Sequence, residues 1–414
     1  MKHLIVGVGA AGIAAAAAIK KQKPSDEVVM ISTDESVYSR CMLHHYISGK
    51  RDTRGLSFVP EGFFKDNKIR WISGETLTGV DTAAKTVNFG SQEEPYDALL
   101  IAAGGKSFFP PIEGITGLRN VYGLRDLSDA RSIKAQAEQN NDIVIIGAGL
   151  VGMDAAYAFA ETNRNGADLK PVVVEIAESI LPLNLDADAA KPYMKKFEEA
   201  GCIFRLGRKV VKVKGKDGSV QSVILDDGTE LPCSLLILAT GIRPNTGFLE
   251  GSGIALDGRK RGVKVNKFME TGVKDVYAAG DVTGLSEDWP NAHIQGKIAG
   301  ANMCGGTEVY YGLFPPKNTI NFFDIPSLSL GQITPMQDDV VECRQDRKRY
   351  EKIILRDGVP VGVILRGDIS NCGFWQYLIK NKLNISHIQK PIWKVSFADA
   401  YGLAEDGEYR WQSG

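Results

Sequence analysis

The sequence predicts an α/β protein with two parallel-sheet domains and a small C-terminal α+β domain. Two observations lead to this fold class. An apolar strand that runs into the glycine pattern GxGxxG occurs twice, and a later apolar strand with a small-residue end follows each repeat. Both patterns stop near residue 315. The chain of 414 residues is also longer than the ~250–300 residues at which single hydrophobic cores stop growing, which indicates several domains.

The two repeats read LIVGVGAAG at residues 4–12 and IVIIGAGLVG at residues 143–152, and an alanine-rich helical stretch follows each. In such a turn the first glycine permits a tight bend, the second lets the backbone approach a pyrophosphate, and the third lets helix and strand pack closely. The helix N-terminus then faces the anion. The repeats therefore predict two Rossmann-like dinucleotide-binding domains. The predicted contacts are Gly7, Gly9, Ala10, Ala11 and Gly12 in the first repeat and Gly147, Gly149, Leu150, Val151 and Gly152 in the second.

A later strand accompanies each repeat. The runs DALLIAAGG at residues 97–105 and SLLILATGIRPN at residues 234–245 are typical of buried parallel strands. Their small C-terminal residues let a crossing chain or a cofactor come close. Ala103, Gly104 and Gly241 are therefore further predicted contacts.

A third apolar strand places a carboxylate at its C-terminal end. It lies in VKDVYAAGDVTG at residues 273–284, where Gly280 and Asp281 follow the strand. Sheets of this kind bind their ligands at the carboxyl ends of the strands. Both residues are therefore predicted to contact a ligand.

The patterns divide the chain into three predicted domains. The C-terminal one contains a strand pair with a DG turn, YEKIILRDGVPVGVIL, followed by the helical stretch FWQYLIKNK. The predicted boundaries are residues 1–112 with 243–315 for the first domain, 113–242 for the second, and 316–414 for the third.

Composition narrows the function classes. The formal net charge is −1, so no overall field attracts nucleic acid or an anionic membrane. The six cysteines are scattered without a CxxC pair, so we expect no zinc or iron–sulfur site. Free thiols and the absence of a long apolar segment favour a cytoplasmic protein.

With these motifs in view, the chain resembles the pyridine nucleotide-disulfide oxidoreductase superfamily of two-dinucleotide flavoproteins. The resemblance implies that the first glycine turn holds the FAD pyrophosphate, that Asp281 binds the ribityl-phosphate part, and that the second glycine turn holds NAD(P)H. The stretch WPNAHIQGKIAGANM at residues 289–303, which includes Ala292, corresponds to the helix whose N-terminus points at the flavin carbonyl. Its dipole would stabilise negative charge on reduced flavin. The C-terminal domain resembles the interface domain of the superfamily.

The strand ends differ between the two repeats. Glu175 follows PVVV, where an acidic side chain accepts hydrogen bonds from the adenosine ribose and repels a 2′-phosphate. This favours NADH over NADPH. In the first repeat the strand EVVMIS puts Ser32 where an acid is usual. Either Ser32 bonds the ribose of FAD directly, or Asp34 or Glu35 substitutes for the acid, with Thr33 beside them.

The segment YSRCMLHHYISG is most similar to the flavin-side segment of rubredoxin reductases and of the flavin domain of assimilatory nitrite reductases, Tyr-x-Arg-Pro-x-Leu. Tyr38, Arg40 and Leu43 match, which implies that Arg40 lies at the cofactor, and Cys41 takes the proline position. The same cysteine aligns with the redox cysteine of coenzyme A-disulfide reductases and water-forming NADH oxidases. Cys41 is therefore either a flavin-side thiolate, activated by a helix N-terminus and His44, or a small pocket-lining residue.

Two further residues are candidate catalytic groups. His45 stands where relatives often carry a lysine near the flavin, so it either stabilises flavin charge or packs as an ordinary helix residue. Asp154 stands where the family usually has glutamate near the nicotinamide, and it either keeps that role or caps a buried helix face.

The resemblance implies an FAD-dependent NAD(P)H oxidoreductase. Electrons would pass from NADH through flavin N5 to, or from, a small carrier protein of rubredoxin or ferredoxin type. The alternatives are an NADH oxidase or coenzyme A-disulfide reductase that uses Cys41, and a non-catalytic flavin-binding assembly subunit. The family also implies a homodimer or a subunit of a redox complex. A basic cluster of Arg347, Lys348, Arg349 and Lys352 is either a docking site for an acidic carrier or a solvated face.

Overall fold

The computed structural model describes residues 1–258, 261–312, 316–403 and 405–411. The chain divides into two compact units, each built from several segments. The first unit comprises Met1–Asn140, Gly215–Val220 and Ser234–Leu313, and the second comprises Asn141–Lys214, Gln221–Cys233 and Phe314–Gly414.

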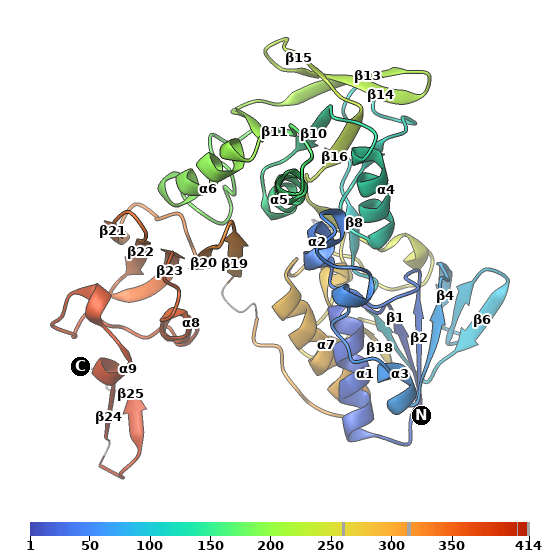
Figure 1. Cartoon of the computed structure of the whole chain (residues 1–414). Coiled ribbons are helices and arrows are strands. Elements are labelled where there is room, and N and C mark those ends of the chain that lie inside the picture. The colour runs from blue at the N-terminus through green and yellow to red at the C-terminus, as the bar shows by residue number, and fades with distance from the viewer. Residues whose placement is uncertain (259–260, 313–315, 404, 412–414) are drawn as a thin grey trace. The chain divides into compact units, whose positions relative to one another are not determined.

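A parallel five-stranded sheet forms the centre of the first unit, in the order β18-β7-β1-β2-β3 (Figure 1). Apolar and largely β-branched runs form the inner strands, which suits strands buried on both faces. His3 to Val6 pair in parallel register with Val28 to Ile31 on one side and with Ala98 to Ile101 on the other. The strands are β1 (Lys2–Val6), β2 (Glu27–Ser32), β3 (Ile69–Ser73), β7 (Ala98–Ile101) and β18 (Val276–Ala278).

The two faces of this sheet are covered by different elements. Ile5, Met30 and Leu100 pack with helices α1 (Ala10–Gln22) and α7 (Trp289–Met303) on one face. Leu4 and Val6, which point the other way, pack with the antiparallel sheet of β4 (Leu77–Asp81), β5 (Thr86–Phe89) and β6 (Gln92–Pro95). Alternate side chains of one strand thus enter two separate cores.

Helices α1 and α7 lie side by side (Figure 1), and glycines set their separation. A Cβ atom at Gly296 would lie 2.1 Å from the Ala11 carbonyl oxygen, and one at Gly300 would lie 2.5 Å from that of Ala15. The two backbones therefore touch. Asp288 begins α7, because its side chain accepts a hydrogen bond from the Asn291 amide at 2.8 Å.

The remaining elements of the first unit are short. Strand β8 pairs antiparallel with β17, and β9 pairs in parallel with β16. Their bounds, with those of the short helices, are α2 (Leu43–Ile47), α3 (Phe63–Asp66), β8 (Gly105–Ser107), β9 (Val121–Tyr122), α4 (Leu127–Ala137), β16 (Leu235–Leu238) and β17 (Ile242–Pro244).

The second unit contains the other glycine repeat. Strands β10 (Ile143–Ile146), β11 (Val172–Glu175) and β12 (Ile203–Leu206) pair in parallel. The Gly147 amide donates to the Val174 carbonyl at 2.8 Å, as the Gly7 amide donates to that of Ile31 at 2.8 Å, so the two turns have the same geometry. The other elements are α5 (Leu150–Arg164), α6 (Ala187–Glu199) and β15 (Glu230–Pro232), together with β13 (Val210–Lys216) and β14 (Ser219–Leu225) except for residues 215–220, which belong to the first unit.

An antiparallel five-stranded sheet, β19-β20-β23-β22-β21, forms the C-terminal part of the second unit. Leu328, Val363 and Leu365 of this sheet pack against Trp375 and Leu378 of helix α8. The bounds are β19 (Lys317–Phe322), β20 (Ile325–Gly331), β21 (Val340–Gln345), β22 (Tyr350–Arg356), β23 (Val359–Arg366), α8 (Cys372–Asn381), α9 (Phe397–Ala400), β24 (Tyr401–Leu403) and β25 (Tyr409–Trp411).

Polar contacts join helix α6 to this sheet. The Asp186 carboxylate caps α6 and also accepts hydrogen bonds from the Tyr350 hydroxyl at 2.6 Å and the Lys352 ammonium at 2.9 Å. The Tyr193 hydroxyl bonds Ser327 at 2.7 Å. The predicted fold class is confirmed, with parallel sheets after both repeats and a C-terminal sheet domain, while the three predicted domain boundaries stay predictions. None of the helices in the described ranges is long and apolar enough to cross a membrane.

The contact between α1 and α7 is testable with one added methyl group. We expect Gly296→Ala to lower the free energy of unfolding by about 1–3 kcal/mol, because the new Cβ must displace the α1 backbone. The matched control is Gly373→Ala on α8, where a Cβ meets nothing within 4 Å and alanine suits a helix better than glycine. Urea unfolding of both variants measures the difference, and equal stabilities would contradict the close packing.

Candidate dinucleotide and flavin site

A cavity of about 960 Å³ lies in the first unit, beyond the carboxyl ends of β1, β2, β7 and β18. Its volume is at the upper end of the ~300–1,000 Å³ common for ligand sites. Many of the residues predicted from the sequence line it, namely Gly7, Gly9, Ala10, Ala11, Ser32, Thr33, Asp34, Arg40, Cys41, Ala103, Gly104, Gly280, Asp281 and Ala292.

The glycines of the first turn have separate structural roles. Gly7 has φ +106°, and a Cβ there would lie 2.3 Å from the Ala102 carbonyl oxygen, so the residue permits a tight bend against β7. At Gly9 a Cβ would meet nothing within 4 Å, which leaves open space for a ligand at the N-terminus of α1. Gly12 does not line the cavity; a Cβ there would lie 2.0 Å from the Gly7 carbonyl oxygen, so it serves helix packing.

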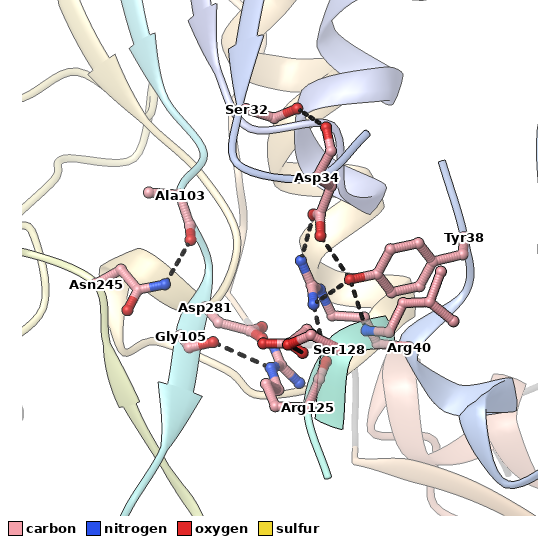
Figure 2. Close-up of polar contacts among 12 residues, drawn as sticks. Ser32, Asp34, Tyr38, Arg40, Ala103, Gly105, Arg125, Ser128, Asn245 and Asp281 are labelled. Carbon is pink, nitrogen blue, oxygen red and sulfur yellow. Dashed lines mark hydrogen bonds and ion pairs between the residues drawn. The ribbon is translucent and has the colours of Figure 1, made fainter. Parts of the chain in front are cut away.

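Asp281 and Arg125 form an ion pair on the cavity wall (Figure 2). The Arg125 Nε–H also donates to the Gly105 carbonyl at 3.1 Å. Burial raises the pKa of Asp281, and the adjacent Arg125 guanidinium opposes that rise. The pair therefore keeps a buried carboxylate beside a fixed cation.

A second arginine is fixed by the segment that follows β2 (Figure 2). The Arg40 guanidinium donates to the Asp34 carboxylate at 2.7 Å, to the Tyr38 hydroxyl at 3.1 Å, and to the Arg125 carbonyl at 2.8 Å. The Tyr38 hydroxyl donates to Asp34 at 2.5 Å, and burial raises the pKa of this tyrosine. Two guanidinium groups and the N-terminus of α1 thus border one cavity, which fits a diphosphate.

Of the three candidates for the adenosine ribose in the first unit, Ser32 and Asp34 already have partners. The Ser32 hydroxyl donates to the Asp34 carbonyl at 2.8 Å and accepts from the Trp71 indole at 3.0 Å. The two oxygens of the Asp34 carboxylate bind Tyr38 and Arg40. Glu35 is exposed. A hydroxyl has two lone pairs, so Ser32 keeps one acceptor position.

Cys41 is exposed and lines the cavity from a 3₁₀ turn, Arg40–Met42, that leads into α2. Burial lowers the pKa of His44 to about 3, and the charges of His45 and of neighbouring cations add to the shift. The His44 ring is therefore neutral at physiological pH, so it supplies no positive charge to the Cys41 thiolate. The His45 ring lies 4.1 Å from that of His44, between centroids, and His45 is not among the cavity-lining residues.

The second glycine turn lies in the other unit. Gly149 is the N-cap residue of helix α5, and Val151, in the first turn, is 40% exposed. The Glu175 carboxylate accepts the Ala148 amide at 2.7 Å and the Ala177 amide at 2.9 Å, so its charge is fixed at the end of β11. Burial raises the pKa of Asp154, on α5, well above its ordinary value.

The remaining predicted residues are placed as follows. Gly152 is buried in α5, and Gly147 has φ +102° in the turn before it. Leu150 is the first residue of that helix. Gly241 lies in the first unit with φ +96°, and its carbonyl accepts the Phe108 amide at 2.8 Å.

The basic cluster of the C-terminal sheet is partly neutralised. Lys352 pairs with Asp186 at 2.9 Å, and Arg349 lies 3.4 Å from Asp368. Arg347 and Lys348 are exposed in the turn before β22. Because two of the four basic residues are in ion pairs, the positive charge available to an acidic partner is smaller than the sequence of the cluster indicates.

Several cavity residues were not predicted from the sequence. Arg125 follows the short strand β9 in GLRDLSDA, with no glycine pattern to mark it. Asn245 donates through its side chain to the Ala103 carbonyl and through its amide to that of Gly104, both at 2.9 Å. The run GIRPN after a strand end is the signal for Asn245, because an amide there can bond a neighbouring strand end.

The fold and these turns define an α/β protein with two dinucleotide-binding sites. Known proteins that are similar to this chain identify its family. Residues 1–296 match the family described as pyridine nucleotide-disulphide oxidoreductase, and residues 316–383 match the rubredoxin NAD⁺ reductase C-terminal domain. The chain belongs to the pyridine nucleotide-disulphide oxidoreductase family.

Three similar proteins illustrate the range of the family. An NADH oxidase of Methanocaldococcus jannaschii is 32% identical, covering 75% of this chain and 72% of its own. The epsilon subunit of an NADH-dependent phenylglyoxylate dehydrogenase of Aromatoleum evansii is 29% identical, covering 94% and 93%. The crystal structure of the NADH:rubredoxin oxidoreductase of Clostridium acetobutylicum has a TM-score of 0.75 at 25% identity, covering 94% of this chain and 97% of that one.

The chain is accordingly a flavin-dependent NADH oxidoreductase, and its cofactors are FAD and NADH. The cavity of the first unit fits FAD on two grounds. Side chains are excluded where the backbone must approach a diphosphate, and two guanidinium groups are already fixed beside that position.

The Arg125 contacts lead to a prediction for FAD affinity. We expect Arg125→Met to raise the dissociation constant of FAD about tenfold or more, because a charged hydrogen-bond donor is lost and Asp281 is left buried without its cation. Fluorescence titration of the apoprotein with FAD measures this. Arg131→Met is the control, since Arg131 is exposed on α4, and equal affinities of the two variants would contradict the role of Arg125.

Proposed function

We propose that this chain passes electrons from NADH through FAD to a small electron-carrier protein of rubredoxin or ferredoxin type. The observation that carries the proposal is the match of residues 316–383 to the rubredoxin NAD⁺ reductase C-terminal domain. The likeness of the whole fold to an NADH:rubredoxin oxidoreductase adds support. Bound FAD would accept a hydride from NADH and release electrons singly, as a one-electron carrier requires.

The residues would divide this work between them. The Gly9 turn and the α1 N-terminus, with Arg40 and Arg125, would hold the FAD diphosphate, and Asp281 would hold the ribityl part. The second glycine turn would hold NADH, and the fixed carboxylate of Glu175 would accept the ribose hydroxyls and repel a 2′-phosphate.

The physiological setting has two forms. The chain is similar to the epsilon subunit of a dehydrogenase over nearly the full length of both chains. This similarity supports a role for the chain as the NADH-reactive subunit of a larger redox complex. The other form is a free homodimer. In both forms this chain would hold FAD and NADH within reach of a carrier centre, and the reduction potentials of the partners would set the direction of electron flow.

A second candidate function has an observation of its own. Cys41 is exposed on the cavity wall, and relatives include an NADH oxidase and an NAD(P)H sulfur oxidoreductase (CoA-dependent) of Pyrococcus abyssi at 30% identity. In this alternative Cys41 is a redox thiol that exchanges electrons with the flavin. The neutral state of His44 favours the carrier function over this one, because no imidazolium stabilises the thiolate.

Electron-carrier turnover tests the main proposal. We expect the purified holoenzyme with NADH to reduce oxidised rubredoxin or a [2Fe–2S] ferredoxin at least about tenfold faster than it reduces coenzyme A disulfide or oxygen, each at equal concentration. Loss of the NADH absorbance gives every rate, measured anaerobically for the carriers and the disulfide and in air for oxygen. Faster reduction of the disulfide or of oxygen would instead select the second candidate.

Cys41 is tested separately by stoichiometry. We expect anaerobic titration to complete flavin reduction with one NADH per FAD, without a long-wavelength thiolate-to-flavin band, and Cys41→Ser to titrate identically. Cys372→Ser, at a cysteine on α8, is the control. Uptake of a second reducing equivalent that Cys41→Ser abolishes would show that the thiol takes part.

A further inference from the structure

We propose that Gln295 is a positioning residue that fixes the Gly280–Asp281 turn to helix α7, so that both elements keep one spacing across the FAD cavity. Gln295 lies on α7, one helical turn after Asn291, and its side chain is fully buried. It does not line the cavity. The proposal concerns FAD binding and holds for either candidate electron acceptor.

The turn that Gln295 contacts cannot hold its own shape. Gly280 has φ +82° and ψ −160°, a conformation open essentially to glycine alone. A Cβ there would lie 3.1 Å from the Ala11 side chain and 3.6 Å from that of Ala292, so the turn lies between the starts of two helices. The next residue, Asp281, carries the carboxylate that binds Arg125. Any drift of Gly280 would therefore move Asp281 within the cavity.

Gln295 supplies the bond that stops this drift. Its side-chain oxygen accepts the Gly280 amide at 2.8 Å. The Thr283 hydroxyl donates to the Gly280 carbonyl at 2.8 Å, which fixes the other side of the same residue. An apolar side chain at position 295 would leave the Gly280 amide buried without a partner, and an unsatisfied buried donor is costly.

The amide nitrogen of Gln295 links the same point to the start of α7. It donates to the Tyr310 hydroxyl at 3.3 Å, and that hydroxyl donates to the Asn291 side chain at 2.9 Å. Asn291 in turn donates to the N-cap residue Asp288 at 2.8 Å, through its backbone and its side chain alike. A continuous chain of hydrogen bonds thus runs from the Gly280 turn to the N-terminus of α7.

The frame behind this chain is rigid, because α7 touches the backbone of α1 at Gly296 and Gly300. Gln295 therefore holds Asp281 in a fixed position relative to helices α1 and α7, and the first glycine turn leads into α1. The glutamine amide offers an acceptor for the Gly280 amide and a donor for Tyr310 without carrying a charge, which accounts for a fully buried polar side chain at this position of α7.

The test compares Gln295→Leu with a matched control, Asn302→Leu. Asn302 is also a buried amide on α7, but its bonds go to Phe268 and Glu308, away from the cavity. We expect both variants to lower the thermal unfolding midpoint of the apoprotein. Only Gln295→Leu should raise the FAD dissociation constant, about tenfold or more, shift the absorption bands of bound flavin, and make the flavin reduction potential more negative.

Two further variants complete the design. Gln295→Glu keeps an oxygen for the Gly280 amide. Full burial holds the new acid protonated, so its hydroxyl can still donate to Tyr310, and we expect it to bind FAD within about threefold of the native chain. Tyr310→Phe removes the bond from Gln295 and the bond to Asn291 but leaves the bond between Gln295 and Gly280. It should shift the flavin potential in the same direction, and it decides the matter if Gln295→Leu does not fold. The proposal would be overturned if Gln295→Leu kept the native FAD affinity, flavin spectrum and flavin potential. If Gln295→Leu does not fold, the same result in Tyr310→Phe would overturn it.

Discussion

The contact between the backbones of α1 and α7 is the constraint on which the cofactor cavity depends. Glycine at positions 296 and 300 lets the backbone of α7 approach the backbone of α1 at Ala11 and Ala15. Because backbone packs on backbone, the start of α1, the start of α7 and the end of β18 keep fixed positions around one space. Close packing of this kind transmits strain instead of absorbing it. Small changes at these glycines therefore reach the cofactor although they touch no part of it.

Charge balance is the second organising principle of the cavity. Arg40 and Arg125, two of the arginines that line it, are each paired with an aspartate of the same unit. Buried charges are costly unless they are paired, so these pairs keep the cationic wall stable without a ligand. An entering diphosphate would then compete with carboxylates that already occupy the arginines. The affinity for the cofactor then depends on how much more strongly the arginines bind the diphosphate than they bind the aspartate carboxylates.

The sequence allowed most of the fold to be predicted, since glycine turns and buried strands leave local patterns. Arg125 left none, because its importance comes from Asp281, 156 positions later in the chain. Gln295 was also missed, since a buried amide is recognised only by the groups around it. His44 shows a further limit: proximity to Cys41 suggested activation of the thiol, whereas burial keeps the ring neutral. The structure is needed to find side chains that pair across long stretches of sequence and to judge how burial changes a pKa.

The carboxylate of Asp186 links helix α6 to the C-terminal sheet. One side chain both begins α6 and accepts bonds from two residues of the C-terminal sheet. The start of α6 and the C-terminal sheet therefore share one carboxylate. Loss of Tyr350 or Lys352 would remove a partner from the N-cap residue of a helix that lies more than 150 positions earlier in the chain.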